Sequence, residues 1–211
     1  MLFRTYKQRS EQFNTLTHLV GVLLAVPAVI VLVVYAAMKG DPWRIVSFSV
    51  YGLTLFTLYL FSTLYHGSRG KQKKLFQTLD HLAIYLLIAG SYTPFTLVTL
   101  QGAWGWSLFG TIWLLAVIGI IIDSFHSRGP RIVQMVIYLF MGWLILVAMY
   151  PLMQHLPTGG LVLLITGGIF YTAGIGFYAL DKKIRYGHGI WHMFVVAGSA
   201  SHYFAMLFYI L

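Results

Sequence analysis

Three histidines in this sequence have the spacing and chemistry needed to bind a metal ion. His188 and His192 are four residues apart, so on a helix both imidazoles project from one face. His66 lies far away in the sequence, four residues after Ser62. The chain has no cysteine, so a metal would be held by His, Asp or Glu side chains. A catalytic zinc is typically bound by three protein ligands and a water in a tetrahedral shell. His66, His188 and His192 could be the three protein ligands.

Asp80 is the acidic residue that we expect to complete such a site. It could bind the metal directly, or it could hold and deprotonate a metal-bound water as a general base. Ser62 lies one helical turn before His66, where its hydroxyl could donate to water or to a substrate carbonyl. Each residue also has a simpler interpretation. An Asp at a helix start often caps that helix, and a Ser in an apolar helix usually bonds its own backbone.

The composition indicates that a membrane surrounds the elements that carry these residues. Of the 211 residues, 59% are hydrophobic and 9% are charged. Soluble domains carry about 25% charged residues, so this chain is too poor in charge to cover a water-facing surface. Aromatic residues make up 17% of the chain, which fits Trp and Tyr at the membrane interfaces.

Seven apolar runs each approach or exceed the roughly 20 residues that a spanning helix requires. The sequence therefore predicts an all-α membrane protein, a bundle of seven transmembrane helices. Pro27 and Pro94 fall inside runs, where we expect kinks that a bundle tolerates. Residues 1–16 are predicted to be a cytoplasmic N-terminal segment, and residues 17–211 the seven-helix domain. The runs are 17–38, 44–66, 79–100, 104–122, 132–154, 161–180 and 189–211.

The basic residues predict the orientation of these helices. Of the 14 Lys and Arg residues, only Lys39 and Arg44 fall on one side of the predicted membrane. The positive-inside rule then places the N-terminus in the cytoplasm and the C-terminus outside. This topology explains the net charge of +9, so we expect no nucleic-acid partner. The residues on the cytoplasmic side are Arg4, Lys7, Arg9, Arg69, Lys71, Lys73, Lys74, Arg128, Arg131, Lys182, Lys183 and Arg185.

This orientation brings the candidate site residues to one depth. Ser62 and His66 lie on the last turns of the second predicted helix, and Asp80 opens the third. His188 and His192 open the seventh helix from the same cytoplasmic side. Ionisable residues at membrane depth are costly and mark functional sites by default. Their convergence favours a metal site over a chance pair of histidines.

Other polar residues are assigned weaker roles. His81 points away from the helix face that carries its neighbour in the site. His202 lies about 15 Å further along the last helix than the two histidine ligands, so we expect it to make a buried polar contact. Glu11, Asn14 and His18 share one stripe of the first helix. They could line the entrance to the site, but helix capping and packing is the interpretation that the pattern favours slightly.

Four segments of the chain resemble the hemolysin III family, the bacterial members of the progestin and adiponectin receptor (PAQR) superfamily. The resemblance covers nearly the whole chain, in order and at the expected spacing. The segments are EQFNTLTH at 11–18, STLYH at 62–66, LDH at 79–81 running to AGSYTP at 89–94, and HGIWH at 188–192 running to His202.

The resemblance implies a seven-helix protein of the bacterial plasma membrane with a cytoplasmic N-terminus. It implies that His66, His188 and His192 bind zinc, with Asp80 and Ser62 beside them. Animal relatives are similar to ceramidases, which hydrolyse a lipid amide. The bacterial branch is named for cytolytic activity and is associated with membrane lipid homeostasis. This chain lacks the long N-terminal region of the animal receptors and has short extracellular loops, which disfavours a peptide-hormone receptor.

The favoured interpretation is a Zn2+-dependent intramembrane hydrolase that acts on a lipid amide or ester with an acyl chain. Asp80 would then serve as general base and Ser62 would help to polarise the carbonyl. The first alternative is a non-enzymatic membrane sensor or regulator, in which Asp80 completes the coordination of a structural zinc. The second is a cytolysin, which the sequence disfavours because it has no amphipathic inserting segment. The sequence makes no prediction of oligomeric state.

Overall fold

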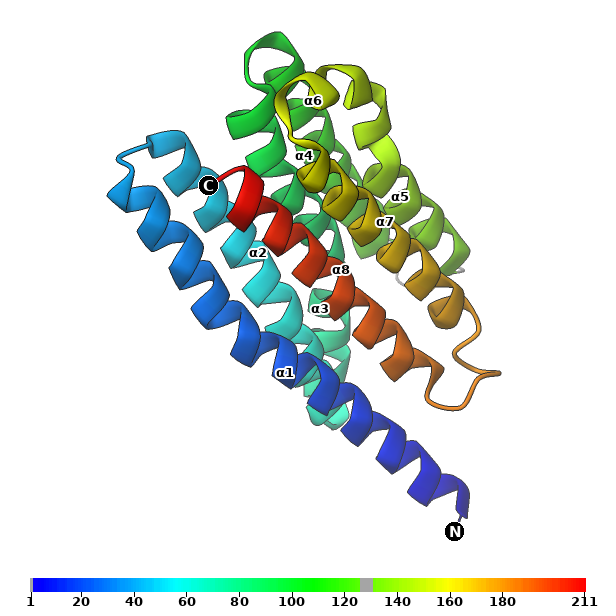
Figure 1. The fold of residues 1–211 in the computed structure, drawn as a ribbon. Coiled ribbons are helices and arrows are strands. Elements are labelled where there is room, and N and C mark those ends of the chain that lie inside the picture. Colours follow the sequence, from blue (N-terminus) through cyan, green and yellow to red (C-terminus); the bar gives the residue numbers. More distant parts are fainter. Residues whose placement is uncertain (1, 126–130) are drawn as a thin grey trace.

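A computed structural model describes residues 2–125 and 131–211, and within these ranges every regular element is helical. The helices pack side by side along one common direction (Figure 1). This confirms the all-α fold class. The elements are α1 (Leu2–Met38), α2 (Pro42–Gly67), α3 (Gly70–Pro94), a π-helix (Phe95–Leu100), α4 (Gly102–Phe125), α5 (Arg131–Trp143), a 3-10 helix (Leu144–Ala148), α6 (Met149–His155), α7 (Thr158–Ala179) and α8 (Gly187–Tyr209).

Six helical segments of the described chain are long and apolar enough to cross a membrane. They comprise α1, α2, α3 with the π-helix, α4, the continuous run from α5 to α6, and α7. The seventh, α8, has 23 residues and sufficient length, but it is not among the six. Its polar residues lower its hydropathy, and several of them are buried. The buried ones are His192, Ser199, Ser201 and His202.

Helix α1 begins earlier than the sequence pattern predicted. The first span was expected to begin at residue 17, after a separate segment, whereas the helix runs without a break from Leu2 to Met38. Two polar residues before position 17, Glu11 and Asn14, have partners on α2 or α3. The predicted position of residues 1–16 in the cytoplasm stays a prediction. Of the basic residues used for that prediction, Arg128 lies outside the described residues.

Two long helices contain breaks, and one tyrosine stabilises the break in the second of them. Pro94 ends α3, and the chain continues as a π-helix, as expected for a proline inside a span. Tyr92, two residues earlier, reaches the point where α5 becomes a 3-10 helix. Its hydroxyl lies 2.7 Å from the Met141 carbonyl oxygen, to which it donates, and accepts from the Ile145 N–H at 2.8 Å. Backbone groups freed by a helix break are therefore satisfied inside the bundle, as a membrane requires.

The two basic residues on the sparsely charged side have a structural role. Arg44 donates from Nε to the Ile210 carbonyl oxygen at 2.9 Å, and Lys39 donates to the Leu211 carbonyl oxygen. Cations beside the last carbonyls of a helix satisfy them and offset the helix dipole. Lys39 and Arg44 thus hold the end of α8 against the α1–α2 turn. The two ends of the chain lie at opposite ends of the bundle (Figure 1).

Candidate metal centre

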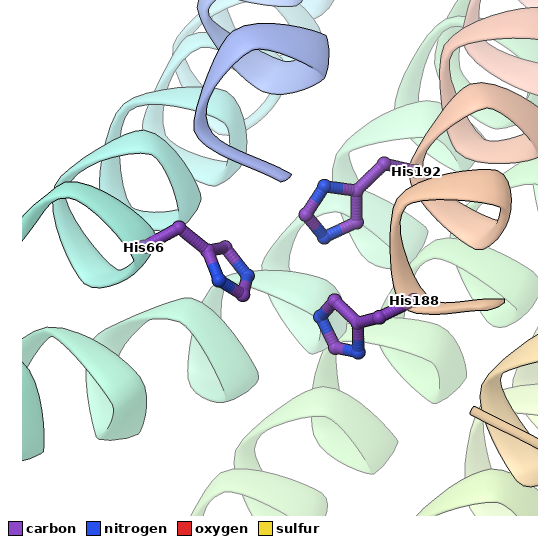
Figure 2. A group of neighbouring side chains, drawn as sticks. All are labelled: His66, His188 and His192. Atoms are coloured by element: carbon purple, nitrogen blue, oxygen red, sulfur yellow. The ribbon is translucent and has the colours of Figure 1, made fainter. Parts of the chain in front are cut away.

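Helices α2 and α8 bring the three predicted histidine ligands together at one end of the bundle. Each of His66, His188 and His192 offers a ring nitrogen, and these atoms all lie within 4.8 Å of one another. The ring centroids of His66 are 4.9 and 5.0 Å from those of His188 and His192, which are 4.8 Å apart. The three rings face a common centre (Figure 2). The arrangement could hold a metal ion.

The outer nitrogen of His66 has an acidic partner on α1. Its Nδ1 lies 2.8 Å from Glu11 Oε2, and Lys73 Nζ of α3 donates to the same oxygen at 3.0 Å. A carboxylate oxygen only accepts hydrogen bonds. The proton of the neutral His66 ring therefore lies on Nδ1, which leaves the Nε2 lone pair available.

The other two histidines follow the same pattern. His192 Nδ1 lies 3.2 Å from the Asn14 carbonyl oxygen and 3.1 Å from Thr17 Oγ1, both on α1. His188 Nδ1 lies 3.3 Å from Asp181 Oδ2, in the connection before α8. Metal-binding histidines almost always donate their second ring N–H to a carboxylate or backbone carbonyl, which fixes the tautomer.

The inner nitrogens of these three rings are buried and have no protein partner. The Nε2 atoms of His66, His188 and His192 make no hydrogen bond within the part of the chain that the structure describes. A buried polar atom without a partner costs free energy of folding, and here three such atoms converge on one point. A cation at that point would satisfy all three lone pairs, so the donor set fits a borderline metal such as zinc.

Gly189 explains how α1 comes close enough to reach the histidines of α8. A Cβ built at this position would lie 2.3 Å from Phe13 Cδ1 and 2.9 Å from Asn14 Oδ1. A larger residue would require the Phe13 ring and the Asn14 side chain, which lie on α1 next to the site, to shift. The glycine after the first histidine of HGIWH is therefore part of the geometry of the site.

Asp80 and Ser62 are buried side chains of α3 and α2, and they do not join the histidine cluster. Asp80 is 2% exposed and Ser62 is fully buried, and the two side chains are close enough to interact. Across the described residues, the group whose ligand atoms mutually approach within 4.8 Å contains the three histidines and no carboxylate. Asp80 instead lines a cavity that His18 also lines. This position suits a group that acts on a water or a substrate.

The cavity extends from Asp80 deep into the bundle. It encloses about 1170 Å³ of empty space, counting the part that is open to the outside. Its lining runs from Asp80 on α3 to Phe95 at the start of the π-helix, which is about 22 Å at 1.5 Å per helical residue. Leu146 and Ile165 line it and are 49% and 38% exposed. The cavity therefore reaches the lipid-facing surface between the α5–α6 segment and α7.

His18 is a component of the site that the sequence pattern undervalued. Its ring stacks on His192, with centroids 3.6 Å apart and planes 11° apart. Neither of its ring nitrogens has a hydrogen-bond partner among the described residues, although the side chain is 1% exposed. Glu11 and Asn14 also contact the histidine ligands, so the stripe that they share with His18 lines the site. Its three-and-four-residue spacing was the signal for this role.

Two further histidines lie outside the cluster. His202 donates from Nε2 to the Leu164 carbonyl oxygen at 3.1 Å, which confirms the expected buried polar contact. His81 is half-buried, and its carbonyl oxygen accepts a hydrogen bond from the Tyr138 hydroxyl at 3.2 Å.

Comparison with known proteins gives consistent relationships over nearly the whole chain. A family model described as haemolysin-III related matches residues 6–203. Hemolysin-3 of Bacillus cereus is 48% identical over 204 residues, covering 96% of this chain and 93% of that protein. The hemolysin-3 homolog of Bacillus subtilis is 44% identical and covers 95% and 94%. The human monocyte to macrophage differentiation factor is 31% identical and covers 93% and 83%. As its motifs predicted, this chain belongs to the haemolysin-III-related family.

Proposed function

We propose that this protein is a zinc-dependent intramembrane hydrolase that cleaves a lipid amide or ester. The observation that carries the proposal is the convergence of three buried Nε2 atoms that have no hydrogen-bond partner among the described residues. The buried carboxylate of Asp80 lines a cavity that also reaches His18, and His18 stacks on His192. His66, His188 and His192 would hold the metal and leave its fourth position open. A zinc ion bound there would supply a Lewis acid and an activated water.

The protein residues would then perform the proton transfers. Asp80 accepts a proton from the attacking water, whose oxygen forms the new bond to the substrate carbonyl carbon. The same proton passes to the leaving nitrogen or oxygen as the amide or ester bond breaks. Water is thereby divided between a fatty acid and an amine or alcohol. Ser62, buried beside Asp80, donates to the carbonyl oxygen or to the water.

The cavity is suited to the acyl chain of the substrate. Its lining is mainly aliphatic and aromatic, with Leu87 and Ile88 on α3 and Phe95 at the start of the π-helix. The exposed pair Leu146 and Ile165 marks a lateral entrance through which a chain could enter from the bilayer. Lipid entry from the side fits an enzyme whose substrate never leaves the membrane, and a role in membrane lipid homeostasis follows.

The proposed setting is the bacterial plasma membrane, crossed seven times with the N-terminus in the cytoplasm. Helix α8 serves as the seventh span because its polar residues face other helices and the metal centre. The odd number of spans agrees with chain ends at opposite ends of the bundle (Figure 1). The metal centre would then lie near the cytoplasmic face, among the basic residues of that side.

A structural zinc in a non-enzymatic regulator is the main competing function. It would need Asp80 as the fourth ligand, with its oxygen close to all three histidine nitrogens. The separation of Asp80 from the cluster and its place in the cavity wall favour a role on water instead. The cytolytic alternative draws its support from the names of the two Bacillus relatives.

Metal removal tests the proposed activity. Purified protein in lipid nanodiscs is expected to release fatty acid from a lipid amide or ester, measured by mass spectrometry. Extraction of the metal with a chelator should abolish the release, and added Zn2+ should restore it, because only the metal supplies the activated water. Equal turnover by metal-free and zinc-loaded protein would refute the hydrolase.

Filling the cavity tests the path of the acyl chain. The change Ile88→Trp is expected to lower turnover of long-chain substrates by roughly tenfold or more, a loss of about 1.4 kcal/mol of binding. Short-chain substrates should lose less, and bound metal should be unchanged. The matched control is Ile169→Trp, since Ile169 lies on α7 with 55% exposure and does not line the cavity. Equal losses for long and short chains would place the acyl chain elsewhere.

A further inference from the structure

Glu11 connects three helices through a single carboxylate oxygen. Its Oε2 lies 2.8 Å from His66 Nδ1 on α2 and 3.0 Å from Lys73 Nζ on α3. Lys73 also donates to the Tyr65 carbonyl oxygen at 3.2 Å, and its ammonium lies 4.5 Å from the centroid of the Tyr65 ring. Lys73 is therefore anchored to the end of α2, and it holds the Glu11 carboxylate against His66.

A second group on α1 competes for the same nitrogen of His66. Asn14 Nδ2 lies 3.4 Å from His66 Nδ1. An amide nitrogen only donates, so this contact favours the tautomer in which Nδ1 is the acceptor and Nε2 carries the proton. The Glu11 carboxylate favours the opposite tautomer, because it can only accept. At 2.8 Å the charged partner is the closer of the two and prevails.

The two tautomers of His66 differ in their ability to bind a metal. Nε2 faces His188 and His192, and with the proton on Nδ1 it presents a lone pair to the shared centre. With the proton on Nε2, it would present an N–H bond to that centre and could not act as a ligand. His192 has no such competition between tautomers. The Asn14 carbonyl oxygen can only accept from its Nδ1, and Thr17 Oγ1, the other contact of Nδ1, can accept as well.

We infer that Glu11 is a positioning residue that selects the metal-binding tautomer of His66 against the competing Asn14 side chain. This inference rests on the metal site of the proposed function, but not on turnover of a lipid. Glu11 touches no reacting atom in this assignment and acts only through His66. Its partner Lys73 keeps the carboxylate oriented and balances its charge.

Metal affinity and its rescue by a second change test the inference. The full-length protein in detergent would be titrated with Zn2+ against a chelating dye. Glu11→Ala is expected to weaken zinc binding by about 10- to 100-fold, the usual loss for an outer partner of a ligand histidine. Glu11→Gln should lose less, because its amide oxygen can still accept from Nδ1. Asp41→Ala removes a helix-capping carboxylate at the other end of α2 and should leave the affinity unchanged.

The discriminating variant is the double change Glu11→Ala with Asn14→Leu. Loss of the competing amide should recover part of the zinc affinity, since nothing then favours a proton on Nε2. The main-chain carbonyl of Asn14, which contacts His192, is retained in this variant. A residue that merely packed α1 onto the bundle would show additive losses instead. The visible spectrum of bound Co2+ gives a second readout, expected to change in Glu11→Ala and to recover in the double variant.

Each outcome separates this inference from the proposed function. Wild-type affinity in Glu11→Ala, or a further loss in the double variant, would overturn tautomer selection while leaving the metal site intact. Wild-type protein that binds no metal would overturn both. The expected pattern of affinities in a protein without lipid turnover would support the inference and refute the hydrolase.

Discussion

Changing His192 to alanine is expected to remove high-affinity metal binding from the protein. One of three ligand nitrogens is lost, and the loss should exceed the roughly 10- to 100-fold that outer partners contribute. Lipid turnover should fall with the metal content. Metal bound per protein, measured by inductively coupled plasma mass spectrometry after gel filtration, checks the result.

The same helix offers a matched control. His202→Ala makes the same substitution in another buried histidine of α8, which contacts a carbonyl oxygen of α7 instead of the cluster. Both variants create a buried void, which costs about 2–5 kcal/mol in comparable core truncations. His202→Ala should retain its metal, so a comparable loss of metal from both variants would contradict the assignment.

Changing Asp80 to asparagine is expected to separate metal binding from chemistry. The amide cannot accept the proton of the attacking water, so turnover should fall by about 100- to 10,000-fold, the usual contribution of a general base. Zinc affinity should stay near that of the wild type, because the carboxylate lies outside the histidine cluster. Parallel measurements of zinc affinity and fatty-acid release check both expectations.

Asp123→Asn supplies the control for this change. Asp123 is a buried carboxylate on α4 that accepts a hydrogen bond from Gln134 on α5. Its conversion to an amide should leave both metal and turnover close to wild type. If Asp80→Asn instead loses its metal together with its activity, Asp80 is a ligand and the structural-zinc function is favoured.

The sequence predicted the fold class and the grouping of the three histidines for identifiable physical reasons. Hydrophobic length alone distinguishes helices that can span a membrane, and it located every long helix from α1 to α7. His188 and His192 could be paired because four residues bring side chains to one helix face. His66 required the topology as well, since only the shared membrane depth connects it to α8.

The parts of the site that escaped prediction depend on how the helices pack. Nothing in the sequence says that α1 lies against α2 and α8, so Glu11 and His18 had no visible partner. The helical structure of residues before position 17 was not predicted from hydrophobic length, because these residues are mostly polar. The separation of Asp80 from the cluster depends on the relative placement of α2, α3 and α8, which spacing along one helix cannot give.

The contact between α1 and α8 has a consequence for biosynthesis. The hydrogen bond from His192 to the Asn14 carbonyl joins residues that are 178 positions apart. A nascent chain that has been synthesised only to the end of α7 possesses Glu11 and His66 but lacks His188 and His192. Such distant contacts form late, because the intervening chain must first be ordered. An ion in the proposed centre would thus bind only after α8 has joined the bundle. Bound metal would therefore indicate a completely folded protein.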